Sequence, residues 1–166
     1  AVRLGMGPDL EYKITFGFAN PAHLHIFVPD MGTVGSGLVI SGDVCAQDAD
    51  TEGVAFANML QDKYRPNNKN GNVMYLDGLI EGMMQVEALR TTYLAVGPEM
   101  TSEDVLKNGF WQMKDFSTGD LTITPLTFGE GDPQGLDQVR LQQAQDGKSV
   151  ELGSEPIANI IPAPKK

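Results

Sequence analysis

Apolar and polar residues follow a helical period in the stretch 72–93, the longest uninterrupted pattern of this kind in the chain. Apolar side chains recur there at steps of three and four, and charged or amide side chains fall between them. The apolar positions are Leu76, Leu79, Ile80, Met83, Val86 and Leu89. We therefore predict a helix over 72–93 that packs on a sheet through Leu76, Ile80 and Met83.

Two glycines, Gly78 and Gly82, lie about one turn apart inside this predicted helix. Each costs a helix about 1 kcal/mol relative to Ala, so they are easier to explain if another backbone packs close to them. The simpler alternative is an ordinary core helix of any α/β domain. In both cases one face of the helix belongs to a hydrophobic core.

A second helix is predicted before this one, over 52–64. Asp50 or Thr51 is placed to cap it, because short polar side chains accept hydrogen bonds from the first free backbone N–H groups of a helix. Its apolar side consists of Val54, Ala57, Leu60 and Tyr64. A loop rich in Pro, Asn and Gly then separates the two helices.

Thr101, followed by Asp104, forms a capping-box pattern that predicts a third, shorter helix over 102–108. Trp111 lies just beyond it. An indole ring at this position could stack on a ligand, but a single Trp beside a helix end more often packs in a core, and we favour the core.

Strand signals occur in three places. The segment 11–18 is short and rich in β-branched and aromatic residues, which fits a strand of an α/β sheet. Pro125 interrupts a second run, 122–128, and makes it an edge strand or a bulge. Asp146 and Gly147 separate two strand-like runs and are typical of a type I′ hairpin. Helices and strands together predict the α/β class.

The composition narrows the class of protein. The chain has 166 residues, enough for one domain with its own core. No apolar run approaches the roughly 20 residues that cross a bilayer. The net charge of −10 argues against a nucleic-acid partner, because phosphate binding needs clustered Lys and Arg. We therefore expect neither nucleic-acid binding nor membrane insertion.

The beginning of the chain shows no signal-peptide pattern of basic and then apolar residues. The range 1–6 is similar to the last turn of a helix that is closed by a glycine. We expect the chain to be a fragment or cleaved product of a longer precursor. Its exposed apolar surface is then expected to cause self-association or to hold a bound N-terminal fragment.

Few residues carry recognisable catalytic or metal-binding chemistry. His23 and His25 share a face only on a strand, whereas 21–28 is expected to be a short helix or turn, so packing histidines are favoured over a metal site. Cys45 is the single cysteine, and a structural thiol is favoured over a nucleophile because no base accompanies it at a recognisable spacing. We expect no enzyme activity, no metal and no cofactor.

The end of the first predicted strand is a candidate ligand position. Phe18, Ala19 and Asn20 lie there, and ligands in open α/β sheets bind beyond the carboxyl ends of the strands. The alternative is an ordinary turn in which Asn20 caps a helix that begins at Pro21.

Four short pieces of sequence carry a resemblance to a known family. They are Tyr75 together with 87–89, and the segments 115–119, 126–128 and 135–140. With the predicted order of elements, they resemble the C-terminal half of the type I periplasmic solute-binding proteins. These are the branched-chain amino-acid-binding proteins that serve ABC importers. The resemblance covers the chain from about residue 3 to residue 152.

The resemblance implies part of a two-lobed α/β fold with open, mostly parallel sheets flanked by helices. It places the end of the second lobe at 1–42, an inter-lobe crossing at 43–52, the returning part of the first lobe at 53–145 and a final hairpin strand and tail at 146–166. A chain of 166 residues is too short for both lobes, so a C-terminal fragment is expected.

The resemblance also implies a ligand site. Asp30 matches the acidic position that holds the ammonium group of an amino acid, and a carboxylate in a partly dry cleft makes a strong charge-assisted hydrogen bond. Asp stands here in place of the Glu of many members, and Pro29 in place of a usual glycine, so an ordinary surface Asp is the alternative. The predicted ligand-binding residues are Asp30, Asn20, Phe18, Ala19 and Tyr75.

The predicted function follows from the resemblance. The chain is expected to belong to the periplasmic or extracytoplasmic binding component of an ABC-type importer. The ligand would be an amino acid or a related small carboxylate or amide, and the parent protein would deliver it to an ABC permease. The alternative is a ligand-sensing domain of a signalling or regulatory protein on the same fold, which the sequence does not separate from an importer.

Overall fold

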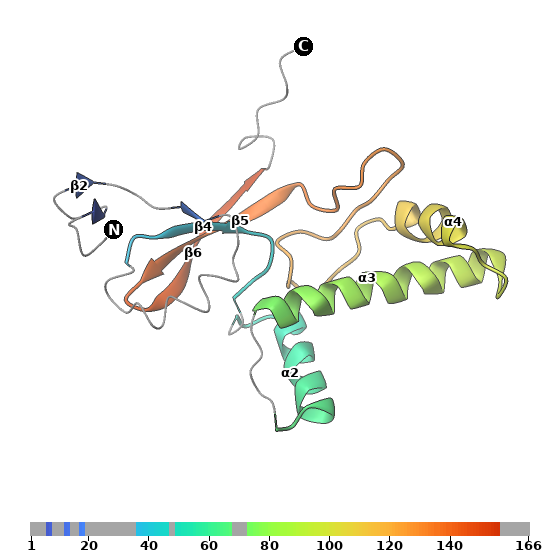
Figure 1. The fold of residues 1–166 in the computed structure, drawn as a ribbon, viewed down its shortest axis with the longest axis horizontal. Helices are drawn as coiled ribbons and strands as arrows, with labels where there is room; N and C mark the ends of the chain where they lie inside the picture. Colours follow the sequence, from blue (N-terminus) through green and yellow to red (C-terminus); the bar gives the residue numbers. More distant parts are fainter. Residues whose placement is uncertain are drawn as a thin grey trace, which may run out of the picture.

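The computed structural model describes residues 6–7, 12–13, 17–18, 36–46, 49–67 and 73–156. Within these ranges, the strands lie at one end of the molecule and the helices at the other (Figure 1). The elements are β1 (Met6–Gly7), β2 (Tyr12–Lys13), β3 (Gly17–Phe18), β4 (Val39–Gly42), α2 (Glu52–Tyr64), α3 (Val73–Val96), α4 (Ser102–Asp104), η3 (Val105–Gly109), η4 (Phe110–Gln112), β5 (Gln138–Gln145) and β6 (Lys148–Pro156). The predicted α/β class is confirmed.

The main sheet has four strands in the order β3-β4-β5-β6. β3 and β4 are parallel, whereas β4, β5 and β6 pair antiparallel. β1 and β2 form a separate parallel pair, so Met6 lies in a strand and not at the end of the predicted helix. The rest of that predicted helix, 1–5, lies outside the described residues.

The hairpin between β5 and β6 is confirmed. Asp146 and Gly147 both have positive φ angles, 51° and 78°, as both central residues of a type I′ turn require. Arg140 anchors the base of this hairpin, because its guanidinium donates to the Glu151 carboxylate at 2.8 Å and to the Asp120 carbonyl at 3.2 Å. The hairpin is therefore fixed to the loop that follows the helices.

α2 has the predicted bounds, and its N-terminus shows why. Of the two candidate caps, Thr51 is the one that accepts a hydrogen bond from the Val54 backbone N–H, at 3.2 Å. Val54 and Ala57 are buried as expected, but Tyr64 is 67% exposed. The prediction was wrong for Tyr64 because the last turn of α2 extends beyond the core.

α3 covers 73–93 of the predicted helix and continues to Val96, and residue 72 lies outside the described residues. Leu76 and Ile80 are buried with residues from α2, from the chain after β4 and from the loop 113–128. The core residues are Val44, Cys45, Val54, Ala57, Leu76, Ile80, Leu121 and Leu126. The predicted face is thus buried, but mainly against a helix and a loop and not on a sheet. Val86 and Leu89, predicted to share this core, are exposed.

The segment after α3 begins as predicted and then differs. The capping box is present, since Thr101 Oγ1 accepts from the Asp104 N–H and the Asp104 carboxylate accepts from the Thr101 N–H. The run α4, η3 and η4 lies along the C-terminal half of α3 (Figure 1). Gly109 permits this contact, because a Cβ there would lie 2.6 Å from the Ala88 carbonyl oxygen.

The predicted strand 122–128 is not formed. Only isolated bridges join Val44 to Thr122 and Phe116 to Leu126. The Thr118 and Thr122 hydroxyls instead bond to each other at 2.7 Å, and the Thr118 hydroxyl also accepts the Thr122 N–H. These side-chain hydrogen bonds, together with separate backbone bonds of Leu126 to Phe116 and of Phe128 to Met113, take the place of a continuous strand ladder, and Pro125 removes a further donor.

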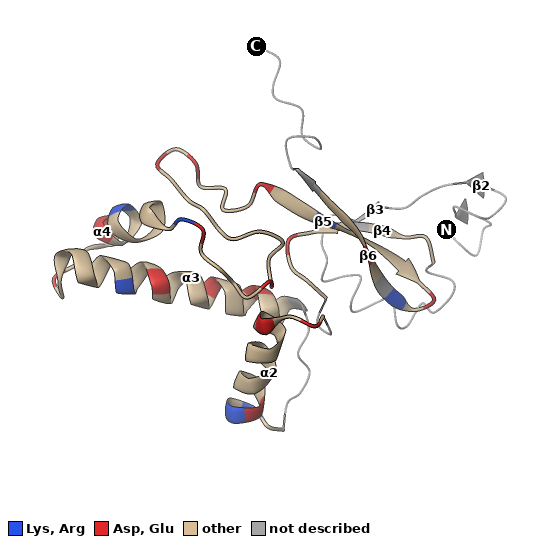
Figure 2. Cartoon of the chain, turned by 180° about the vertical axis from the view of Figure 1, so that it is seen from behind, with Lys and Arg blue, Asp and Glu red and all other residues tan. Residues whose placement is uncertain are grey.

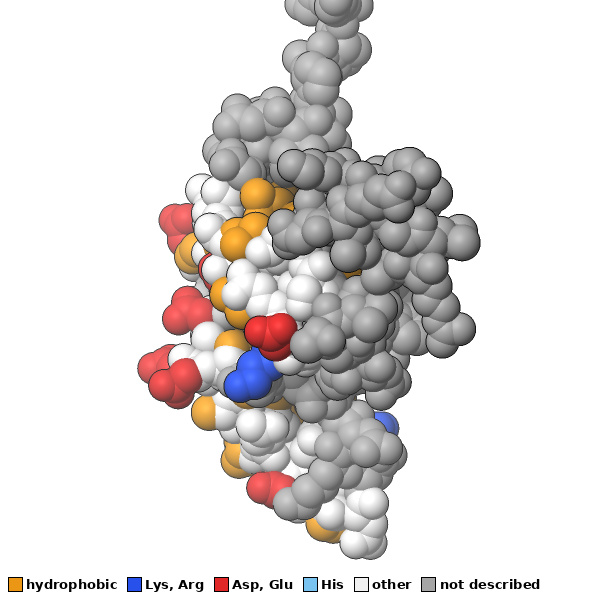
Figure 3. Space-filling view, turned by 90° about the vertical axis from the view of Figure 1, so that its left-hand side faces the viewer, with side chains coloured by type: hydrophobic (Ala, Val, Ile, Leu, Met, Phe, Trp, Pro, Cys, Tyr) orange, Lys and Arg blue, Asp and Glu red, His pale blue; other side chains and the backbone are white. Residues whose placement is uncertain are grey.

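Acidic residues occur on the helices and on the loops around them, with few basic residues between (Figure 2). On the side seen in Figure 3, hydrophobic and acidic side chains both reach the described surface. Within the described ranges, no helix combines the length and hydropathy needed to span a bilayer.

Candidate ligand-binding site

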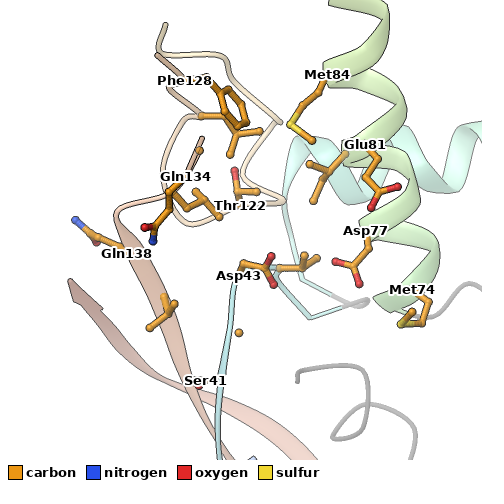
Figure 4. Close-up of a pocket in the computed structure, with 17 residues that line it drawn as sticks. Ser41, Asp43, Met74, Asp77, Glu81, Met84, Thr122, Phe128, Gln134 and Gln138 are labelled. Carbon is orange, nitrogen blue, oxygen red and sulfur yellow. The ribbon is translucent and has the colours of Figure 1, made fainter. Parts of the chain in front are cut away.

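A cavity of about 680 Å³ lies where the sheet meets the helices (Figure 4). Four stretches of chain form its walls: the end of β4, the first half of α3, the loop 122–128 and the approach to β5. The lining residues are Ser41, Gly42, Asp43, Val44, Met74, Asp77, Ile80, Glu81, Met84, Thr122, Leu126, Phe128, Gln134, Gly135, Leu136, Gln138 and Val139. The end of β4 and the start of β5, which pair in the same sheet, therefore both border this cavity.

The helical wall comes from one side of α3. Asp77, Ile80, Glu81 and Met84 follow one another at steps of three, one and three, so they face the same direction on a helix. Ile80 and Met84 supply an apolar surface, which Leu126, Phe128 and Leu136 extend from the opposite side. The cavity can therefore hold a small apolar group.

The charged groups of the lining are all acidic. Burial, followed by the negative charges of Asp43 and Glu81, raises the pKa of Asp77 from 3.8 to about 6. Figure 4 shows the Asp43 and Asp77 carboxylates pointing toward each other, with Glu81 one turn along the helix. The seventeen lining residues, all within the described ranges, include no Lys, Arg or His. This side of the cavity favours a cationic or hydrogen-bond-donating group.

Polar uncharged groups occupy the other wall. Gln134 and Gln138 lie opposite α3 in Figure 4, and Thr122 lies between the two walls. The Thr122 hydroxyl donates to the Thr124 carbonyl at 2.8 Å, which fixes its orientation. Amides at Gln134 and Gln138 can both donate and accept, so they are suited to a neutral polar group.

The predicted site residues are only partly described. Asp30, Asn20 and Ala19 lie outside the described residues, as do His23 and His25. The Phe18 backbone is in β3, where it pairs with Ile40 of β4. The Tyr75 hydroxyl donates to the Ala57 carbonyl of α2 at 3.3 Å, and Tyr75 is not among the cavity-lining residues. Ligand contacts by these five residues stay a prediction.

The sequence reasoning missed the acidic wall of this cavity. Asp77 and Glu81 are among the charged side chains that fall between the apolar positions of the predicted helix. Their four-residue spacing was the available signal, since it puts two carboxylates on one helix face. Asp43 joins them only through the tertiary fold, and no spacing in the sequence links it to α3.

Cys45 is buried beside this region, and its N–H donates to the Leu121 carbonyl at 2.8 Å. Burial raises the pKa of its thiol, although Arg140 acts in the opposite direction. A raised pKa favours the neutral thiol, which agrees with a structural role. Among the residues that the structure describes, no group of His, Cys, Asp and Glu is arranged to hold a metal ion.

Comparison with solved structures identifies the fold. A branched chain amino acid ABC transporter from Thermus thermophilus, solved with bound valine, matches 93% of this chain at 22% identity with a TM-score of 0.76. A possible leucine/isoleucine/valine-binding protein from Rhodopirellula baltica matches 92% at 20% identity with a TM-score of 0.70. A substrate binding protein of an ABC transporter from Aeropyrum pernix matches 77% at 14% identity with a TM-score of 0.61.

The chain spans less than half of each of these proteins: 40%, 38% and 34% of their lengths, in the same order. No protein-family model and no curated protein sequence matches it. The chain therefore has the fold of part of an ABC-transporter binding protein, as the sequence resemblance implied. At these identities the likeness establishes the fold alone.

Proposed function

We propose that this chain is part of the extracytoplasmic solute-binding component of an ABC-type importer. The ligand class is an amino acid, or a related small carboxylate or amide. The likeness to the valine-bound Thermus thermophilus structure over 93% of the chain is the observation that carries this proposal. The partner in the parent protein would be an ABC permease.

The chemistry of the cavity supports an amino-acid ligand. Its volume of about 680 Å³ lies in the range of small-molecule sites. The wall formed by Ile80, Met84 and Leu136 suits an aliphatic side chain. Asp43 and Asp77 offer acceptors for an ammonium group. A ligand carboxylate would need donors other than the charged groups of this lining.

The division into lobes belongs to this proposal and rests on the family resemblance. In this proposal, 1–42 ends the second lobe, 43–52 crosses, 53–145 returns to the first lobe and 146–166 forms the final hairpin strand and tail. β4 ends beside the cavity and β5 begins beside it, so both connections between the sheet and the helices border the same space. Rotation about two such connections is how two-lobed binding proteins close on a ligand.

We propose a binding role and not a catalytic one. The solved neighbours are described as transporter or binding proteins. Cys45 is poorly suited to nucleophilic chemistry because it is buried and its thiol pKa is raised. The predicted contacts from Asp30, Asn20, Phe18 and Ala19 belong to this proposal, with Asp30 as the partner of the ligand's ammonium group.

The test uses the polypeptide encoded by the complete open reading frame that contains these residues. Thermal shift against amino acids, aromatic acids, amides and short polyols would identify a ligand, and we expect valine or leucine to raise the Tm. Calorimetry on the best hit would then compare Asp30→Ala with Glu99→Ala, an exposed position outside the cavity lining.

Loss of a charged partner weakens binding by about 100-fold, whereas the control should bind like the parent protein. Equal affinity in the two variants would remove Asp30 from the site. Stabilisation only by compounds without an amino, carboxylate or amide group would overturn the proposed ligand class. Turnover of any of these compounds would overturn the binding role.

A further inference from the structure

Arg140 joins the sheet to the helical part of the molecule from a buried position. It lies in β5, and only 8% of the residue is exposed. Its Nη1 donates to the Glu151 carboxylate of β6 at 2.8 Å, and its Nη2 donates to the Asp120 backbone carbonyl at 3.2 Å. We call these three groups the Arg140 bridge. One of its anchors lies in the sheet, and the other lies in the loop 113–128.

The loop anchor of the Arg140 bridge is fixed to the helices. Gly119, directly before Asp120, accepts a hydrogen bond from the Gly53 N–H at the start of α2, at 2.7 Å. Leu121, directly after it, is fully buried in the core that contains Leu76 of α3. The Asp120 carbonyl is thus part of the helical half of the molecule. The Arg140 bridge therefore connects two halves that Figure 1 shows at opposite ends of the structure.

Both ends of the Arg140 bridge adjoin residues that line the cavity. Gln138 and Val139 directly precede Arg140 in β5, and Thr122 lies two residues after Asp120. Arg140 itself is not among the lining residues. The Arg140 bridge is therefore outside the cavity, but it ties together the two chain segments that carry facing parts of its walls.

The third donor of the guanidinium opposes the described arrangement. The Arg140 Nε–H is buried and has no hydrogen-bond partner among the described residues, whereas most buried donors in proteins are paired. The two charged hydrogen bonds of the Arg140 bridge are of a stronger kind than neutral ones and act in a buried setting. Burial raises the pKa of the Cys45 thiol and Arg140 lowers it, so the guanidinium also lies near the chain that leaves β4. The arrangement thus depends on the two paired donors.

We propose that Arg140 is a positioning residue that sets the orientation of the sheet relative to the helices, and with it the width of the cavity. Removal of the two charged hydrogen bonds then lets the sheet take more than one orientation. Any consequence for solute affinity rests on the proposed function. The orientation itself does not, so it is measured without a ligand.

The distance between two spin labels tests this role. Lys148→Cys on β6 and Lys107→Cys on η3 place one exposed label on each half of the full 166-residue chain. The native thiol of Cys45 is buried and is labelled slowly. Pulsed electron paramagnetic resonance then gives the distribution of distances between the two labels in the folded protein.

Three further substitutions are compared in this labelled chain. Arg140→Met removes every donor of the Arg140 bridge, and Glu151→Gln weakens the sheet anchor alone. Arg90→Gln is the matched control, because it removes an exposed arginine that pairs with Glu87 on α3. Circular dichroism checks that each variant is folded. A merely structural arginine would change the stability and leave the distances in the folded protein as they are.

We expect Arg140→Met to widen the distance distribution at least twofold or to add a second distance, and Glu151→Gln to widen it less. Arg90→Gln should match the parent chain. An unchanged distribution in folded Arg140→Met would overturn the proposal, and so would equal widening in Arg90→Gln. If Arg140→Met does not fold, Glu151→Gln decides, and a distribution like that of the parent chain would then overturn the proposal. Failure of the chain to bind any amino acid would overturn the proposed function and leave this result unaffected.

Discussion

The two halves of α3 have similar apolar content, but the apolar side chains are buried in the first half and exposed in the second. In the first half, Leu76 is 2% exposed and Ile80 is 6% exposed, because α2 and the loop 113–128 cover them. In the second half, Val86 is 66% exposed and Leu94 is 71% exposed, although α4 and η3 run alongside. η3 contacts a different side, where Ala88 and Thr92 meet Gly109.

This difference separates what a periodic pattern specifies from what it leaves open. The pattern specifies that a helix has an apolar face, because each residue turns the helix by a fixed angle. It does not specify the partner. Burial changes sides along α3 because one partner packs at Ile80 and another at Ala88. The same sequence rule therefore predicts burial correctly in one half and incorrectly in the other.

The largest expected effect contrasts two leucines of this helix. Leu76→Ala should lower the free energy of unfolding by about 2–5 kcal/mol, because it leaves a cavity in the core. Leu94→Ala should change it by less than about 0.5 kcal/mol, because that side chain is mostly in solvent. Urea unfolding of the 166-residue chain measures both. Similar losses in the two variants would mean that the halves of α3 do not differ in packing.

Glycine substitutions sharpen the same comparison. Gly109→Ala should cost about 1–3 kcal/mol of folding stability, because its Cβ would lie 2.6 Å from the Ala88 carbonyl oxygen and 2.8 Å from Thr92 Oγ1. Gly82→Ala should instead stabilise the chain by about 1 kcal/mol, since Ala favours the helix and the space is open. Thermal unfolding followed by circular dichroism compares the two. A destabilising Gly82→Ala would reveal a contact at that face in the 166-residue chain itself.

The sequence predicted the fold best where a local interaction decides the structure. Thr51, the capping box of Thr101 and Asp104, and the Asp146–Gly147 turn each act within a few residues, and the structure contains all three. The strand expected over 122–128 failed because the Thr118 and Thr122 hydroxyls bond to each other. The sequence 122–128 is compatible with a strand and with this loop, and the loop forms only because of the tertiary contacts around it.

The candidate site was less predictable for a physical reason. Asp43 lies in the chain after β4 and Asp77 on α3, and they meet because the chain folds back between them. A sequence pattern shows only the neighbours of each carboxylate along the chain, and an isolated acidic residue there indicates solvent exposure. The raised pKa of Asp77 comes from burial and from charges brought together by the fold.

A smaller effect on folding stability is expected from a comparison of two carboxylates. Asp77 lines the cavity, whereas Glu103 lies on the exposed surface of α4. The pKa of Asp77 is raised from 3.8 to about 6 in the folded state, so folding favours the protonated carboxyl. The contribution of Asp77 to stability should therefore be most favourable below about pH 4 and become less favourable as the pH rises to about 6. Asp77→Asn should remove this decline and stabilise the ligand-free chain by about 1 kcal/mol at pH 7, allowing for solvent screening.

Urea unfolding between about pH 4 and pH 7.5 measures how the free energy of unfolding changes with pH across the range of the shifted pKa. Glu103→Gln is the matched control, because Glu103 is an exposed carboxylate on α4 that pairs with Lys107 and lies outside the cavity lining. A slope that survives in Asp77→Asn, or that Glu103→Gln also removes, would assign the pH dependence to other groups.

The smallest expected effect concerns Tyr75, which links the buried half of α3 to α2. Its hydroxyl donates to the Ala57 carbonyl at 3.3 Å, a long and therefore modest hydrogen bond. Tyr75→Phe keeps the ring and removes the donor, so we expect a loss of about 0.5–1 kcal/mol of folding stability. Tyr93→Phe, on the exposed half of the same helix, should be neutral.

Calorimetry with valine on the complete product decides between a structural and a ligand-binding hydroxyl. Because Tyr75 lies outside the cavity lining, an unchanged affinity of Tyr75→Phe for valine would assign the hydroxyl a structural role. A tenfold or greater loss of affinity would instead return this residue to the ligand site that the sequence predicted.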